Sequence, residues 1–492
     1  MSAADDDSLF VYDEVAYPTP VLPAQTPSRM RSACIAFGYE PKACDTASML
    51  EIGCGDGFNL IGCAAAEPAG RYVGFDLSTA AIGRGQEMLA LSGLTNVDLH
   101  SGDITAYPKT GERFDYIVSH GVYGWVPEFV REALLDLVAA RLAPGGVAMV
   151  SYDALPAAAP KVALNRFLRE RTAHLVGPEA QLREAYRLVG ILAAPQHAGS
   201  RLKPMLDLLT KELPHFEPAY FFHDFLAEHY APASMQDFAA AAARRGLRAI
   251  GDAGMTDLFS GDLDDEARAL IAAAGDDYAE RAHLLDMLRG AMMFRRTFLV
   301  REDAPPPLSA RGLKDLSYVF LGGSETGSDE RGPYTKYTEG EETYLIVREP
   351  DERAIMAALD EAEPNELSFA ELVARTGLSE DAVERFLAHA VAVKLVVAQA
   401  SPQPFVVVPG ERPVAAPLIR TMMGVGNWAI TLRHARLVTE PEPTRLFLTL
   451  CDGTRTRAQL AAEMSARFDT DVTLALVEAA IADLGPRRVF SA

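Results

Sequence analysis

Short apolar runs alternate with helical patterns through the first third of the chain. The runs that we interpret as strands cover residues 49–52, 71–76, a stretch ending at Ser101, 114–119 and 142–151, and helical patterns follow the first two at 59–66 and 78–91. Strands that alternate with helices in this way are typical of a parallel sheet with helices on its faces. The sequence therefore predicts an α/β fold for this region.

A linker is predicted after residue 303. The prolines at 305–307 and a stretch rich in glycine and serine from Gly322 to Pro333 interrupt both helical and strand patterns. Such interruptions usually separate folded units, so we expect a further unit in the C-terminal third.

That unit opens with helical signals. Ser368 and Glu371 form a capping box, and a second helical pattern at 379–393 leads into an apolar strand at 395–397. This order resembles a winged helix. The second helix carries more acidic than basic residues and lacks a basic face for DNA, so we expect a module that binds protein or mediates dimerisation.

The first strand runs into a glycine loop with the pattern Glu51-x-Gly53-x-Gly55-x-Gly57. Glycines let the backbone turn tightly and approach a ligand closely. The amides at the start of the following helix, from Asn59, favour an anionic group, which in S-adenosylmethionine (SAM) is the methionyl carboxylate. Nicotinamide and flavin cofactors also use glycine loops, so the loop alone leaves these alternatives open.

Asp76 ends the second strand, where a carboxylate can accept hydrogen bonds from both ribose hydroxyls of a nucleoside cofactor. Two features favour SAM: Glu51 before the loop, and Asp103 with Ile104 after the third strand. The alternative is purely structural, with an ordinary turn at the glycines and a helix cap at Asp76. The occurrence of all the motifs in order favours the cofactor site.

Together these motifs resemble class I SAM-dependent methyltransferases. The resemblance implies an α/β fold with a Rossmann-like sheet of seven strands, and SAM as the cofactor. The residues that it places at the cofactor are Gln25, Thr26, Glu51, Gly53, Gly55, Gly57, Asn59, Asp76, Leu77, Asp103, Ile104 and His120.

Longer segments resemble one bacterial family, the SAM-dependent methyltransferases with a methyltransferase regulatory domain. These segments include 12–18, 120–127, 217–226 and 295–300. The family includes protein-lysine methyltransferases of outer-membrane proteins, which implies a lysine-bearing protein as the acceptor of the methyl group.

The chain departs from this family at two places. A histidine that commonly follows the position of Thr26 is absent, and Asp153-Ala154 follow Tyr152 where relatives carry a glycine and an aromatic residue. Because the second departure lies where class I enzymes bind the acceptor, a small molecule or a peptide natural product is the alternative acceptor.

These patterns suggest six segments. We expect an N-terminal helical cap of the SAM site (1–45), the SAM-binding core (46–152), a helical insertion over the acceptor (153–245), the last strands of the sheet (246–303), a linker with short strands (304–345) and a winged-helix-like C-terminal domain (346–492).

Three aromatic residues are candidates for the acceptor pocket. Tyr123, Trp125 and Tyr152 each follow a predicted strand, and aromatic faces attract both a sulfonium and an ammonium. Core or lid packing is the alternative for all three. His120 could act as a base, although its place at the end of the fourth strand favours a role beside the cofactor.

Composition narrows the partners. A net charge of −22 argues against nucleic acid and suits a basic acceptor. The five cysteines form no CxxC pair, so we expect no metal site. An acidic N-terminus and the lack of a long apolar run predict neither secretion nor membrane insertion, and we expect a cytoplasmic protein that can form a homodimer.

Overall fold

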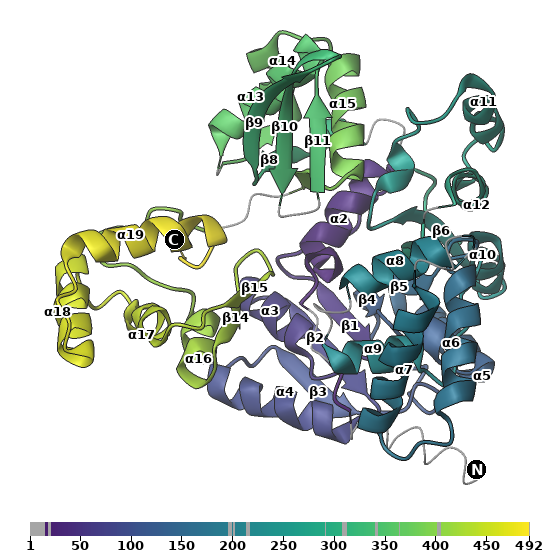
Figure 1. Cartoon of the computed structure of the whole chain (residues 1–492), viewed down its shortest axis with the longest axis horizontal. Helices are drawn as coiled ribbons and strands as arrows, with labels where there is room; N and C mark the ends of the chain where they lie inside the picture. The colour runs from purple at the N-terminus through teal and green to yellow at the C-terminus, as the bar shows by residue number, and fades with distance from the viewer. Residues whose placement is uncertain are drawn as a thin grey trace.

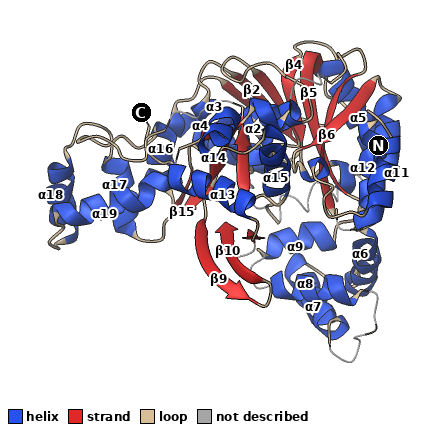
Figure 2. Cartoon of the chain, turned by 90° about the horizontal axis from the view of Figure 1, so that it is seen from above, coloured by secondary structure: helices blue, strands red, loops and turns tan. Residues whose placement is uncertain are grey.

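A mixed sheet of seven strands forms the centre of the molecule. The computed structural model describes residues 15–17, 21–194, 199, 202–212, 217–290, 292–307, 312–339, 343–363, 365–400 and 405–491. The strand order is β3-β2-β1-β4-β5-β7-β6, with only β7 antiparallel to its neighbours in this sheet. The strands are β1 (Ser48–Ile52), β2 (Arg71–Asp76), β3 (Val97–Ser101), β4 (Phe114–Ser119), β5 (Leu142–Asp153), β6 (Leu247–Asp252) and β7 (Phe294–Arg301). The predicted seven-stranded class I sheet is confirmed (Figure 2).

Helices cover both faces of this sheet, because successive residues of each strand point to opposite sides. Met49 and Tyr116 face one hydrophobic cluster, whereas their neighbours Leu50 and Ile117 face another. The first cluster contains α2 (Pro27–Ala36), α3 (Phe58–Ala66) and α4 (Thr79–Ser92), and the second contains α5 (Glu128–Arg141), α10 (Met235–Ala243) and α12 (Tyr278–Arg289).

Four helices between β5 and β6 form a small unit with its own hydrophobic cluster. Leu164, Val189 and Phe221 lie in this cluster, which is separate from those of the sheet. Figure 1 shows these helices on the side of the molecule away from the C-terminal helices. They are α6 (Ala159–Thr172), α7 (Pro178–Leu192), α8 (Lys203–Glu212) and α9 (Pro218–Phe225).

Residues 312–400 form a second unit, at the top of Figure 1. Its core also takes in Ile35 of α2, which lies between this unit and the sheet. The predicted capping box is present: the Glu371 amide donates to the Ser368 hydroxyl over 3.2 Å, and the Ser368 amide donates to the Glu371 carboxylate over 2.8 Å. The elements are β8 (Ser317–Phe320), β9 (Gly323–Asp329), β10 (Gly332–Glu339), β11 (Thr343–Val347), α13 (Pro350–Ala362), β12 (Leu367–Ser368), α14 (Phe369–Thr376), α15 (Glu380–Ala392) and β13 (Val396–Gln399).

The last segment, residues 405–491, packs against the layer of helices over the central sheet. Ile419, Ile430 and Phe447 share one hydrophobic cluster with α3 and α4. Residues 346–492, which the sequence groups as one domain, therefore contribute to two separate clusters. The elements are α16 (Pro417–Val425), β14 (Trp428–Ile430), β15 (Arg436–Val438), α17 (Glu442–Leu450), α18 (Arg457–Phe468) and α19 (Leu474–Leu484).

Within the described residues, no helix is long and apolar enough to cross a membrane. A few short elements complete the fold. They are the helix α11 (Asp265–Ala273) and the 3-10 turns Pro23–Gln25, Tyr123–Trp125, Thr256–Leu258, Leu313–Asp315 and Gly485–Arg487.

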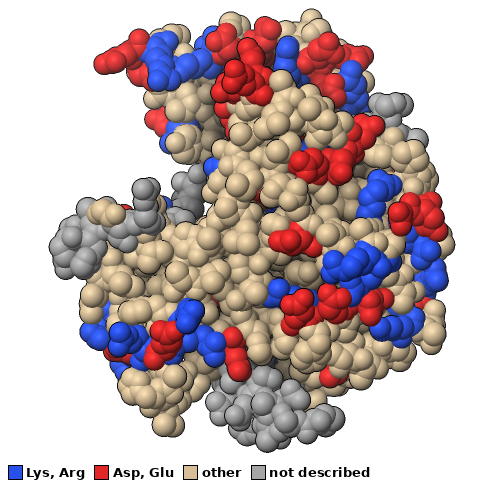
Figure 3. Space-filling view, turned by 90° about the vertical axis from the view of Figure 1, so that its right-hand side faces the viewer, with Lys and Arg blue, Asp and Glu red and all other residues tan. Residues whose placement is uncertain are grey.

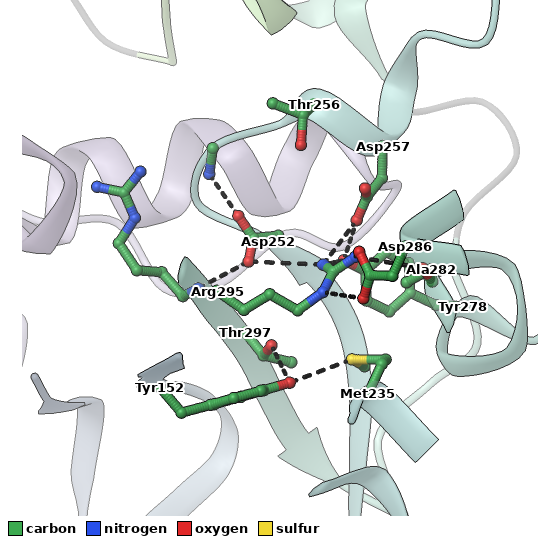
Figure 4. A network of polar contacts seen from close by, with 12 residues as sticks. Tyr152, Met235, Asp252, Thr256, Asp257, Tyr278, Ala282, Asp286, Arg295 and Thr297 are labelled. Atoms are coloured by element: carbon green, nitrogen blue, oxygen red, sulfur yellow. Dashed lines mark hydrogen bonds and ion pairs between the residues drawn. The ribbon is translucent and has the colours of Figure 1, made fainter. Parts of the chain in front are cut away.

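A buried arginine of β7 connects this strand to the turn that follows β6 and to helix α12 (Figure 4). The Arg295 side chain is fully buried and donates to both carboxylate oxygens of Asp286 over 2.7 and 2.8 Å and to Asp257 over 3.0 Å. The Tyr278 hydroxyl also donates to Asp257, over 2.6 Å, and Asp252 lies 3.8 Å from the guanidinium. This network fixes the edge of the sheet from within.

Candidate active site

The glycine loop between β1 and α3 is shaped by positive φ angles. Gly53, Gly55 and Gly57 have φ of 74°, 58° and 72°, a region that side chains disfavour. A Cβ at Gly53 would lie 2.5 Å from the Val122 side chain, and one at Gly57 would lie 2.6 Å from Leu99. A Cβ at Gly55, in contrast, would meet nothing within 4 Å. The loop is thus tightly packed on its protein side and open at Gly55.

Asp76, at the end of β2, is held against this loop. One carboxylate oxygen accepts a hydrogen bond from the Gly55 amide over 2.8 Å, and the other accepts one from the Ser78 amide over 2.9 Å. Ser78 in turn caps α4 by accepting from the Ala81 amide. The backbone therefore fixes the orientation of the carboxylate that the sequence assigns to the ribose.

Glu51 and Asn59 are buried and bonded to one another. The Asn59 amide group donates to both oxygens of Glu51 at 3.3 Å, and burial raises the pKa of Glu51 to about 8. The Asn59 carbonyl oxygen lies 2.6 Å from Nε2 of His434, a residue of the C-terminal segment. Burial lowers the pKa of His434 to about 4, so the neutral ring donates here through Nε2. The C-terminal segment therefore supports the residues beneath the glycine loop.

The outer cofactor candidates differ in exposure. The Leu77 side chain is 46% exposed after β2, and Asp103 is exposed with its carboxylate accepting from the Thr105 amide and hydroxyl. Ile104 packs partly against the second sheet cluster. The Leu77 and Ile104 side chains are apolar and not fully buried, which suits the adenine ring of a cofactor.

Gln25 and Thr26 precede α2. The Thr26 hydroxyl oxygen caps α2 by accepting from the Arg29 amide over 3.3 Å, so part of its role is structural. Gln25 is 2% exposed, and within the described residues its Nε2 has no hydrogen-bond partner.

His120 follows β4 and is neutral at physiological pH. Burial, followed by the nearby Arg296, lowers its pKa to about 3, and its ring contacts Phe294 edge-on at 5.4 Å. Its Nδ1 is buried without a hydrogen-bond partner in the described part of the chain. A base near neutral pH is disfavoured by this pKa, and the place of His120 beside the cofactor stays a prediction.

These features fit SAM. Two predicted cofactor residues, Gln25 and His120, carry buried polar atoms that lack partners among the described residues, and open space adjoins Gly55 and Gly121. SAM offers a carboxylate, an ammonium group and ribose hydroxyls, which match amide donors and carboxylate acceptors of this kind.

Two of the three aromatic candidates for the acceptor pocket lie in the core. Tyr152 is fully buried, with its ring 4.4 Å from that of Phe238 and its hydroxyl 3.2 Å from that of Thr297. Tyr123 is 6% exposed and packs edge-on against the same Phe238. Both faces of β5 are buried at Tyr152, and Tyr123 packs against the same core. Tyr123 and Tyr152 are therefore core residues in this structure.

Trp125 lies instead beside a buried lysine. The Lys161 ammonium, in the first turn of α6, lies 5.4 Å from the Trp125 ring centre and 4.9 Å from that of Tyr230. It forms ion pairs with Asp153 at 2.8 Å and Asp224 at 2.6 Å. We call Trp125, Phe225, Tyr230, Asp153 and Asp224 the lysine cage.

The sequence reasoning missed most of this cage. In the sequence Asp153 stands out only as a departure from the family, Asp224 lies in the family-like segment 217–226 without a role assigned to it, and Lys161 and Tyr230 belong to no motif. Lys161 and Asp224 are 63 positions apart, and Tyr230 is 77 positions from Asp153. No local periodicity marks residues that meet only through the packing of α6 and α9 on the end of β5.

Neither the surface charge nor a metal-binding group points to a further ligand at this site. On the face drawn in Figure 3, basic and acidic side chains are interspersed, and neither sign forms a continuous surface. Among the residues that the structure describes, no group of three His, Cys, Asp or Glu side chains has the geometry to hold a metal ion.

Comparisons with known proteins match this architecture. Residues 49–146 match the family model of a methyltransferase domain, and residues 217–301 match that of a predicted methyltransferase regulatory domain. The second match runs from α9 to β7, so the regulatory segment supplies the last two strands of the central sheet.

Two uncharacterized proteins of Rickettsia prowazekii are similar in sequence. RP789 is 26% identical over 297 residues, which cover 59% of this chain and 53% of the relative. RP028 is 37% identical over 145 residues, which cover 30% of this chain and 58% of the relative. The chain thus spans little more than half the length of these curated relatives.

The structure of PKMT2 from Rickettsia typhi in complex with AdoHcy superposes with a TM-score of 0.78 at 20% identity, covering 96% of this chain and 99% of that chain. A second PKMT2 structure gives a TM-score of 0.76 at 21% identity, with the same coverage. The two proteins therefore share their fold over nearly the whole chain.

The sheet, the glycine loop and the matched family model define a class I SAM-dependent methyltransferase domain. In this chain a segment that matches a methyltransferase domain is followed by one that matches a predicted methyltransferase regulatory domain, in agreement with the family resemblance of its sequence.

Proposed function

We propose that this protein transfers methyl groups from SAM to lysine side chains of a protein acceptor. PKMT2, which shares the fold over almost the full chain, is a protein lysine methyltransferase. The observation within this chain that carries the proposal is the lysine cage. It combines aromatic faces with two carboxylates, the groups that bind an ammonium, at the ends of β4 and β5.

The residues of the chain have separate tasks in this activity. SAM, when bound, supplies an electrophilic methyl group. Asp76 holds the ribose, and the start of α3 faces the methionyl carboxylate. Neutral His120 adds no positive charge beside the sulfonium. The carboxylates of Asp153 and Asp224 take the proton that the acceptor ammonium must lose before its neutral amine can accept the methyl group. Orientation of that amine and exclusion of water then account for most of the rate.

The proposal is tested by incubating the protein with radiolabelled SAM and a lysate of its own host, then separating macromolecules from small metabolites. We expect label in one or a few protein bands, released as methylated lysine on hydrolysis. Label confined to the small-molecule fraction would replace the lysine acceptor by the metabolite or peptide alternative.

Two variants make the result specific to the cofactor site. Asp76→Ala removes two charge-assisted hydrogen bonds to the ribose, and we expect it to weaken SAM binding by about 2–4 kcal/mol and abolish labelling. Asp98→Ala removes an exposed acid of the neighbouring strand β3 and serves as the matched control. Calorimetry with SAM that gives equal affinities for both variants would contradict the placement of the ribose.

A further inference from the structure

Lys161 is 5% exposed, and groups that bind cations nearly surround its ammonium. Besides its two ion pairs, its ammonium lies 4.9–5.4 Å from the ring centres of Trp125, Phe225 and Tyr230. The Tyr230 hydroxyl also donates to the Asp153 carboxylate, over 2.5 Å. This hydrogen bond fixes the orientation of one of the two carboxylates that bind the ammonium.

The helix itself does not favour a lysine at this position. Lys161 lies in the first turn of α6, after Ala158, which provides no side-chain cap. A cation near a helix N-terminus is opposed by the helix dipole, and burial of an ammonium adds a desolvation cost. The cage therefore offsets two unfavourable terms through its contacts with the ammonium.

The cage also lies where a fold of this kind binds its ligands. Asp153 ends β5 and Trp125 follows β4, and ligands of α/β sheets bind beyond the carboxyl ends of the parallel strands. The Phe294 ring connects the two parts of the site, 6.4 Å from Trp125 and 5.4 Å from His120. Trp125 and Tyr230 are only half-buried, so the outer wall of the cage reaches the surface.

We propose that the lysine cage is the ammonium-binding end of the acceptor site, and that Lys161 occupies it as an internal substitute which the acceptor lysine displaces. This inference rests on the proposed function, because only a lysine acceptor presents the same ammonium as Lys161. Two ammonium groups cannot share one cage, since like charges at this distance repel strongly in a buried site.

The alternative is that Lys161 only ties the insertion to the sheet. In that case the cage would hold Lys161 permanently, and the acceptor lysine would bind elsewhere. The two cases differ in whether a cation that enters the cage competes with the acceptor.

The experiment uses the full-length Lys161→Ala variant, which lacks the three terminal carbons and the nitrogen of the lysine side chain. n-Propylammonium supplies those atoms, and we expect it to bind the variant with a Kd on the order of 1 mM by calorimetry and to raise its melting temperature. It should not bind the wild type, and n-propanol, which has the same shape without the charge, should bind neither protein.

Competition then decides the proposal. With the labelled lysate protein as acceptor, saturating n-propylammonium should lower methylation by Lys161→Ala at least fivefold and leave the wild type unchanged. If it binds the variant but methylation is unaffected, the cage is separate from the acceptor site and the inference is overturned. Failure of the wild type to label any protein would instead overturn the proposed function.

A measurement on the wild type covers the case in which Lys161→Ala does not fold. Reductive methylation with mass spectrometry reports which lysines are accessible. Nα-acetyl-Nε-dimethyllysine methylamide, whose tertiary amine does not react, should increase modification of Lys161 several-fold and leave exposed Lys314 unchanged. Protection of Lys161 that persists while this compound inhibits transfer would show that the acceptor binds without displacing it.

Discussion

Lys161 and Arg295 are both buried cations held by aspartates, but their surroundings differ. The Arg295 guanidinium is fully enclosed, and its forked donors bind Asp286 and Asp257 with distances of 2.7–3.0 Å. Lys161 has two point contacts with Asp153 and Asp224, and aromatic faces provide the rest of its shell. Arginine is fixed by the direction of its hydrogen bonds, whereas an ammonium needs only nearby negative charge.

The surroundings of a buried cation distinguish a structural charge from a replaceable one. Removing the arginine would leave three carboxylates close together in the core, with no cation to compensate them. The cage around Lys161 has a half-buried wall, so another ammonium or water can take over the contacts. We therefore expect Arg295 to matter for stability and Lys161 for recognition of the acceptor.

Arg295→Leu is expected to have the largest effect. Asp252, Asp257 and Asp286 would remain buried without their partner, at a cost of about 3–5 kcal/mol in the free energy of unfolding. Urea unfolding followed by circular dichroism measures this loss. A loss under about 1 kcal/mol would mean that the three carboxyl groups are protonated or hydrated in the variant, and the network would then not be a structural charge cluster.

Glu51 shows what burial does to an acid that lacks a cation. Its pKa is raised to about 8 by burial, so the folded state binds a proton that the unfolded state releases near pH 4.5. The stability from this protonated form is complete below pH 4.5 and is lost as the pH rises through about 8. We expect the free energy of unfolding to fall by up to about 2–3 kcal/mol between pH 6 and 8.

Glu51→Gln is the control for this pH dependence, because a glutamine keeps the shape of the protonated acid and does not titrate. Unfolding measured at several pH values should show a flat profile in this range for the variant relative to the wild type. Equal slopes for the two proteins would indicate that another group controls the dependence.

Much of the fold and the cofactor loop could be predicted from the sequence, because their signals are local. The spacing of Gly53, Gly55 and Gly57 before a helix and the acid Asp76 after the next strand both correspond to the loop in the structure. The capping box at Ser368 is equally local.

The acceptor side depends on contacts between distant segments and could not be predicted in this way. Tyr152 follows an apolar run, as a residue at the exposed end of a strand would. Both faces of β5 are covered, however, so its ring lies in the core. His434 reaches Asn59 across 375 positions, and Lys161 reaches Asp224 across 63. No pattern within one helix or strand specifies such pairs.

Lys161→Met should be milder than the loss of Arg295. Methionine keeps the volume of the side chain against the aromatic rings, and one of the two carboxyl groups can accept a proton, because burial already raises the pKa of Asp224. We expect a loss of about 1–2 kcal/mol in urea unfolding. A loss equal to that of Arg295→Leu would remove the distinction between the two cations.

The smallest effects come from a matched pair of tyrosine variants, each of which loses one hydroxyl donor to an aspartate. Tyr278 donates to Asp257 within the core over 2.6 Å, and Tyr230 donates to Asp153 at the half-buried wall of the cage over 2.5 Å. Because water can replace only the outer donor, Tyr278→Phe should cost about 1.5 kcal/mol in urea unfolding and Tyr230→Phe about 0.5–1 kcal/mol. The rate of methylation should change in the opposite order, because only Tyr230 orients a carboxylate of the cage. Tyr230→Phe should slow labelling of the lysate protein severalfold, whereas Tyr278→Phe should leave it unchanged. If the two variants rank the same way in stability and in labelling, the separation of a structural cluster from a recognition cage is not supported.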